Sequence, residues 1–163
     1  MRVLVLGVGN LLLRDEGFGI HVIREFERRY EIPPEVEVVD GGCPGFSLLD
    51  YLREKDLALL VDVVADSAPP GTLQIFENKD LSRFAAVKTL SPHEVSLIEA
   101  LKFAEFSGLK PARIRILAAV PEEISPGLEL SPNLKRALPR ALSWLEEELA
   151  SVNIYLKRRK KCA

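Results

Sequence analysis

Near its N-terminus the chain reads Gly7-Val8-Gly9-Asn10-Leu11-Leu12-Leu13-Arg14-Asp15-Glu16-Gly17-Phe18-Gly19. An apolar run, Val3 to Leu6, precedes this stretch, and an amphipathic segment beginning near Ile20 follows it. This succession predicts a strand, a glycine-bearing loop and a helix, which together form the first crossover of an α/β sheet. Open α/β sheets bind ligands in the loops that leave the C-terminal ends of their parallel strands. The adjacent acids Asp15 and Glu16 are therefore candidate site residues.

The composition is that of a globular protein. The chain has 163 residues, 47% of them hydrophobic, and no apolar run approaches the length of a transmembrane helix. A net charge of −2 gives no electrostatic preference for nucleic acid. The N-terminal residues lack the length and cleavage site of a signal peptide, and the two cysteines, Cys43 and Cys162, have no metal-binding spacing. We expect a cytoplasmic, monomeric protein that binds neither nucleic acid nor membrane.

Strand-like and helix-like segments alternate along the whole chain. The expected strands cover residues 2–7, 36–40, 57–63, 72–77 and 113–120, and the expected helices cover residues 17–30, 46–54, 92–107 and a segment that begins at 132. This order predicts an α/β fold, a three-layer αβα sandwich with a twisted, mostly parallel five-stranded sheet and helices on both faces. We expect one domain over residues 1–151 and a flexible basic tail over residues 152–163.

Three potential metal ligands fall at corresponding places in this pattern. Glu16 follows the first strand, Asp62 ends the third, and His93 opens a helix that has a Ser-Pro start. Because these positions can meet at one edge of the sheet, two carboxylates and an imidazole can form a site for nickel, zinc, iron or manganese. Each residue also has a structural interpretation. Glu16 can face a helix N-terminus, Asp62 can form a turn, and His93 can be an exposed residue in the first turn of a helix.

Two other sites can be considered. Gly7 and Gly9 begin a dinucleotide-binding pattern, and Asp40 ends the second strand as a ribose-binding acid does, but Leu12 occupies the position of the third glycine. Cys43 could act as a nucleophile with His93, although nothing in the sequence orders that pair.

Taken together, the motifs resemble those of the nickel-iron hydrogenase maturation endopeptidases. They occur in the family's order across about Met1 to Leu149. The matching residues are Gly7-Val8-Gly9-Asn10, Asp15-Glu16-Gly17-Phe18-Gly19, Asp40-Gly41-Gly42 with Gly45 and Leu48-Leu49, Asp62, Ser91-Pro92-His93, Val120-Pro121-Glu122 and Leu130-Ser131-Pro132. Two departures are Cys43, where members often have threonine or another small residue, and Ala118, where glycine is frequent.

The resemblance implies an aspartic-type endopeptidase that removes the C-terminal extension of a hydrogenase large-subunit precursor after nickel insertion. The family's metal-binding residues fall on Glu16, Asp62 and His93, and the nickel they meet is supplied by the substrate. Asp62 or Asp40 could accept the proton of the attacking water. A non-catalytic nickel-checkpoint or delivery protein, and a nucleotide-binding module, are the alternatives.

Overall fold

The computed structural model describes residues 1–87 and 95–160. Its centre is a five-stranded sheet in the order β3-β1-β4-β6-β5, in which β5 runs antiparallel to β6 and the other neighbours are parallel. The strands are β1 (Val3–Gly7), β3 (Val36–Asp40), β4 (Leu57–Val63), β5 (Leu73–Glu77) and β6 (Arg113–Ala119). All five occupy the segments expected from the sequence.

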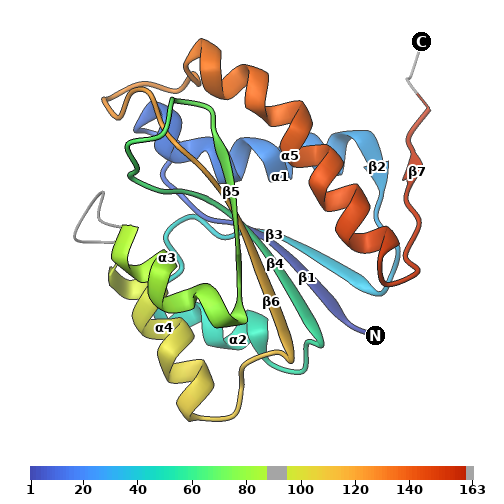
Figure 1. Ribbon diagram of the computed structural model, residues 1–163. Coiled ribbons are helices and arrows are strands. Elements are labelled where there is room, and N and C mark those ends of the chain that lie inside the picture. Colours follow the sequence, from blue (N-terminus) through green and yellow to red (C-terminus); the bar gives the residue numbers. More distant parts are fainter. Residues whose placement is uncertain (88–94, 161–163) are drawn as a thin grey trace.

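Helices cover both faces of the sheet (Figure 1). One face carries α1 (Phe18–Arg29) and α5 (Pro132–Ala150), and the other carries α2 (Leu48–Leu52), α3 (Leu81–Val87) and α4 (Val95–Phe106). Short 3-10 turns precede three of them: η1 (Arg14–Gly17), η2 (Gly45–Ser47) and η3 (Asn78–Asp80). The predicted three-layer αβα sandwich is confirmed. Within the described ranges, no helix is both long and apolar enough to cross a membrane.

The alternation of side chains along β4 explains the three layers. Leu59 and Val61 belong to the hydrophobic core under α1 and α5, whereas Ala58 and Leu60 belong to the core under α2, α3 and α4. A strand that is apolar on both sides must be covered on both faces, and all seven residues of β4 are buried. Asp62 is the one charged residue in this strand.

Two helical details differ from the sequence prediction, and a third is not tested. Residues 78–87, expected to be a polar connector, form η3 and α3, because Phe84 is fully buried against Phe76 with ring centroids 5.1 Å apart. Helix α5 runs without a break through Pro139, where a kink or restart was expected. The expected start of the third helix, Ser91-Pro92, lies outside the described residues.

The C-terminal segment also differs from the expected frayed tail. Lys157–Arg158 form β7, which pairs antiparallel with β2 (Tyr30–Glu31) at the end of α1. The backbone N–H of Arg159 donates to the carbonyl of Arg29 at 2.7 Å, and partly buried Ile154 and Leu156 pack on the core under α1 and α5. Apolar residues just before the basic run therefore dock this segment onto the domain.

Candidate active site

The ends of β1 and β4 and the start of α1 meet at one backbone oxygen. The N–H of Val8 donates to the carbonyl of Val61 at 2.9 Å. A Cβ placed on Gly19 would lie only 2.3 Å from the same oxygen, so a glycine is required for α1 to approach the sheet this closely. Glu16 comes just before α1 and Asp62 just after Val61, and this close packing therefore brings both acids to the same edge of the sheet.

Glu16 is buried in the η1 turn, with 4% of its surface exposed. The N–H of Asn10 donates to the Glu16 carbonyl at 3.1 Å, so the loop folds back on itself at this acid. A Cβ on Gly9 would lie 1.9 Å from the same carbonyl oxygen, and the φ of Gly9 is +146°. Glycine at position 9 is thus a requirement for placing Glu16.

Asp62 is 1% exposed and is the last residue but one of β4. The N–H of Val63 donates to Asp62 Oδ1 at 2.8 Å, which helps to orient the carboxylate. In the sheet register Asp62 lies beside Ala118 of β6. Buried carboxylates at the C-terminal edge of a sheet are more typical of ligand-binding or catalytic sites than of ordinary core positions.

Asp15 is fully buried and has a different environment from its neighbour Glu16. Its carboxylate accepts four hydrogen bonds, from the backbone N–H groups of Glu122, Glu123 and Ser131 at 2.8–3.0 Å and from the Ser131 hydroxyl at 2.7 Å. These contacts attach the segment between β6 and α5 to the first loop. Asp15 therefore acts as a structural clamp, a role that the sequence reasoning did not assign.

The glycine-rich loop after β3, residues 41–45, contacts the first loop, which follows β1. The N–H of Gly9 donates to the Gly42 carbonyl at 2.8 Å, and Cys43 Sγ lies 3.8 Å from the Gly9 carbonyl oxygen. Asp40, at the end of β3, is partly exposed, and its Oδ2 accepts bonds from Arg24 Nε and Nη2 at 3.1 and 3.0 Å. In a dinucleotide-binding site, an acid at the position of Asp40 would bind a ribose. Here the Asp40 carboxylate is paired with Arg24 instead.

The third predicted ligand, His93, lies outside the described residues. Among residues 1–87 and 95–160, no three His, Cys, Asp or Glu side chains lie close enough together to hold a metal ion. The described part of the site therefore supplies two buried carboxylates, Glu16 and Asp62. Two hard oxygen donors of this kind suit a divalent metal when a borderline nitrogen donor completes the set.

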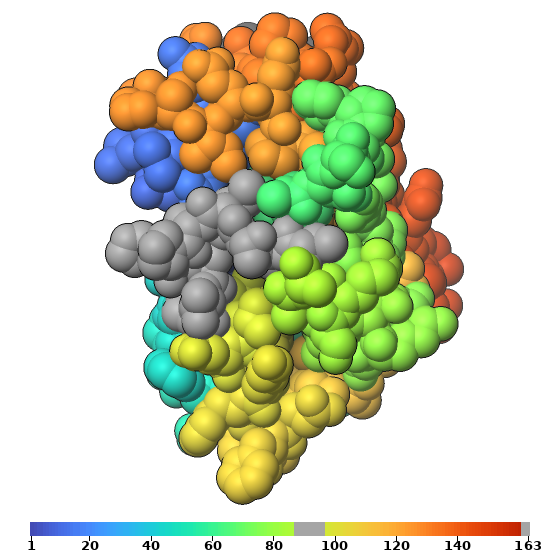
Figure 2. Space-filling view, turned by 60° about the vertical axis from the view of Figure 1, so that its left-hand side comes forward, coloured from blue at the N-terminus to red at the C-terminus, as the bar shows by residue number. Residues whose placement is uncertain are grey.

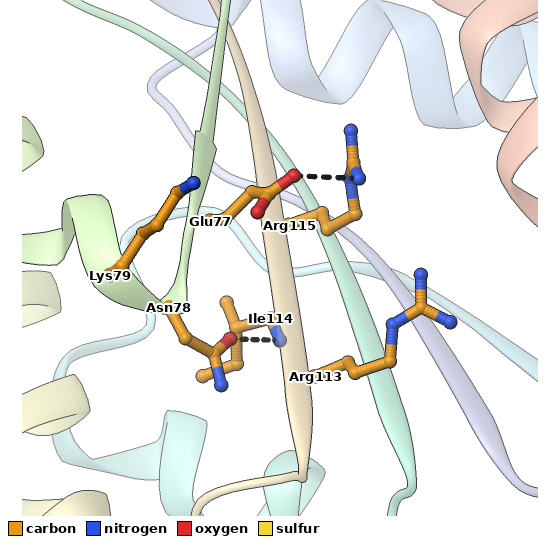
Figure 3. Close-up of a pocket in the computed structure, with 6 residues that line it drawn as sticks. All are labelled: Glu77, Asn78, Lys79, Arg113, Ile114 and Arg115. Carbon is orange, nitrogen blue, oxygen red and sulfur yellow. Dashed lines mark hydrogen bonds and ion pairs between the residues drawn. The ribbon is translucent and has the colours of Figure 1, made fainter.

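A pocket lies at the opposite end of β6 and does not belong to this site (Figure 3). It has a volume of about 370 Å³, and its polar groups largely pair with one another. Arg115 Nη1 lies 2.9 Å from Glu77 Oε1, and the Asn78 side-chain oxygen accepts the Ile114 N–H. Its lining residues are Glu77, Asn78, Lys79, Arg113, Ile114 and Arg115. These pairs join β5 to β6 and indicate a structural role.

His21, the other histidine of the chain, lies on α1 and faces the segment after β6. Burial lowers its pKa from the ordinary value of 6.5, a hydrogen bond to the Leu128 backbone acts in the opposite direction, and the nearby Arg24 lowers the pKa further. The neutral imidazole is therefore favoured in the folded protein. Protonation of His21 would place a charge at a partly buried position, which is unfavourable because the charge loses solvation.

We expect His21 to make folding stability pH-dependent below about pH 6.5. Because its pKa is lower in the folded than in the unfolded state, its contribution is complete above 6.5 and is lost as the pH falls through the folded-state pKa. The pH dependence is measured by urea unfolding of the wild type and of His21→Gln at several pH values between about 7.5 and about 5. The wild type should lose more stability on acidification than the variant, and parallel curves would contradict the assignment.

Comparisons with known proteins found similar sequences and similar folds. The family model described as hydrogenase maturation protease (HycI) matches residues 20–148. The chain is 34% identical to the hydrogenase 2 maturation protease of Escherichia coli K12, covering 93% of this chain and 91% of that protein. It is 31% identical to the hydrogenase expression/formation protein HupD of Bradyrhizobium diazoefficiens, covering 97% and 83%. The solved structure of the hydrogenase maturating endopeptidase HybD from E. coli superposes with a TM-score of 0.92 at 31% identity, covering 98% of both chains.

Proposed function

The chain belongs to the hydrogenase maturation protease family, and on that premise we propose that it is an endopeptidase acting on a nickel-iron hydrogenase large-subunit precursor. It would remove the C-terminal extension of the precursor after nickel has been inserted. The observation that carries this proposal is the pair of buried carboxylates, Glu16 and Asp62, at one edge of the sheet in a chain that matches the family over nearly its whole length.

We propose that Glu16, Asp62 and His93 recognise the nickel of the precursor. Two carboxylates and an imidazole leave coordination positions for ligands that the substrate itself provides. Nickel held in this way would supply a Lewis acid and would restrict cleavage to precursors that carry the metal. We propose that the reaction takes place in the cytoplasm, where Cys43 and Cys162 would remain reduced.

Cleavage of the peptide bond requires a group that accepts the proton of the attacking water. Water adds to the scissile carbonyl carbon, the C–N bond breaks, and the proton passes to the leaving amine. Of the two candidates, we assign this role to Asp62, because it is buried at the same edge of the sheet as Glu16. Asp40 is a weaker candidate, since its Oδ2 already accepts two bonds from Arg24.

The test is to incubate the purified chain with a cognate large-subunit precursor, with and without nickel, and to measure the intact mass of the precursor. We expect a C-terminal peptide to be lost only from the nickel-loaded precursor. If the loaded precursor keeps its full mass, the protein is not the protease proposed here. Binding of the loaded precursor without cleavage would instead identify a nickel-checkpoint or delivery protein.

A further inference from the structure

Two loops are joined next to the candidate site. Leu13 and Gly127 form a parallel β-bridge between the first loop and the segment after β6. The N–H of Gly127 donates to the Leu12 carbonyl at 2.9 Å, and the N–H of Arg14 donates to the Gly127 carbonyl at 3.0 Å. Together with the Asp15 clamp, these bonds fix the two loops to one another as a single unit.

This unit holds three large apolar side chains in solvent, which we call the loop ridge: Leu12, Ile124 and Leu128. Their exposed fractions are 66%, 37% and 65%, and none of them belongs to either hydrophobic core. The exposure of Leu12 is not a result of a loose backbone. Its N–H donates to Asn10 Oδ1 at 2.9 Å, and its carbonyl accepts the Gly127 N–H. The backbone that carries Leu12 is therefore held by hydrogen bonds, and neither hydrophobic core includes the three side chains.

The loop ridge is continuous with the candidate site. Leu12 precedes Glu16 by four residues in the same loop, and the Glu16 N–H donates to the carbonyl of Leu13 at 3.2 Å. Figure 2 shows the first loop, in blue, beside the segment that follows β6, in orange, on one face of the molecule. Leu12 therefore stands in the same short loop as Glu16, the proposed nickel ligand.

We propose that the loop ridge is the docking surface for an apolar patch on the hydrogenase large-subunit precursor. This inference rests on the proposed function and adds the surface through which the substrate is held. Fixed, exposed apolar groups next to a reactive site are typical of protein-binding surfaces. Side chains that stand out from two loops fit the surface of another protein, whereas small molecules bind in concave pockets.

The experiment compares the wild type with the double variant Leu12→Ser/Leu128→Ser. The matched control is Tyr155→Ser, which removes a side chain that is 73% exposed in the segment between α5 and β7. Precursor cleavage is measured over a range of precursor concentrations, and binding of the precursor to each variant is measured separately by biolayer interferometry. We expect the double variant to bind about tenfold or more weakly, with the loss of cleavage carried by KM, and the control to match the wild type.

The outcomes separate this inference from the proposed function. If the wild type cleaves the precursor and the double variant has the same KM and binding, the docking surface is wrong while the protease function stands. If the wild type binds but does not cleave, the protease function fails, and the binding of the double variant alone decides the docking surface. If light scattering shows that the loop ridge instead joins two copies of this chain, the inference is overturned.

Discussion

Glu16→Gln is expected to reduce cleavage of the nickel-loaded precursor by about 1000-fold or more, because the substitution removes a charged ligand without removing the side chain's volume. His93→Ala should have an effect of the same size if the imidazole is the third ligand. Intact-mass time courses at saturating precursor measure both. Cooperative urea unfolding of each variant would establish that the loss is chemical and not a failure to fold.

The matched control for this prediction is Glu27→Gln, which makes the same change at an exposed position on α1. Its cleavage rate should be within about twofold of the wild type, since surface substitutions away from a site have small effects. Cleavage at the wild-type rate by the His93→Ala protein would remove this histidine from the proposed ligand set.

Asp15→Ala is expected to lower the free energy of unfolding by about 3–5 kcal/mol, the largest stability change that we predict. The substitution leaves three backbone N–H groups and the Ser131 hydroxyl without their shared acceptor, and it does so at a fully buried position. Urea unfolding measures the effect as a lower midpoint with an unchanged dependence on denaturant.

Ser131→Ala serves as the graded comparison, because it removes one of the four hydrogen bonds to Asp15 and leaves the three backbone donors paired. Its cost should be about 1 kcal/mol. An Asp15→Ala protein that unfolds within about 1 kcal/mol of the wild type would show that the clamp contributes little. The structural role that we assign to Asp15, as distinct from the ligand role of Glu16, would then be wrong.

Much of the fold was predictable because its signals are local. Strand β4 is an apolar run with one aspartate next to its end, and a strand of this kind has few alternatives to the centre of a sheet covered on both faces. Helix α3 was missed because its seven residues are too few for a clear helical pattern, and the burial of Phe84 depends on a contact with the Phe76 ring of β5. The docking of β7 was missed because its basic residues suggest solvation and its partner, β2, is far away in sequence.

The candidate site was predictable only in part, because some of its contacts join residues that are far apart in the sequence. The sequence picks out Glu16 and Asp62 by their places after strands, but it does not separate the role of Glu16 from that of Asp15. That distinction depends on Ser131, which is 116 residues away and carries no local sign of the contact. Gly9 and Gly19 are required because neighbouring backbone oxygens approach them closely, a reason that the sequence pattern alone does not show.

The pairing of β2 with β7 has a consequence for folding kinetics. Tyr30 and Arg158 meet only after almost the entire chain between them has been ordered, so closing this contact early would cost a large loop entropy. Such contacts form late, after the transition state, and contribute mainly to slow unfolding. We therefore expect the pairing of β2 with β7 to slow unfolding of the folded domain and to have little effect on the folding rate.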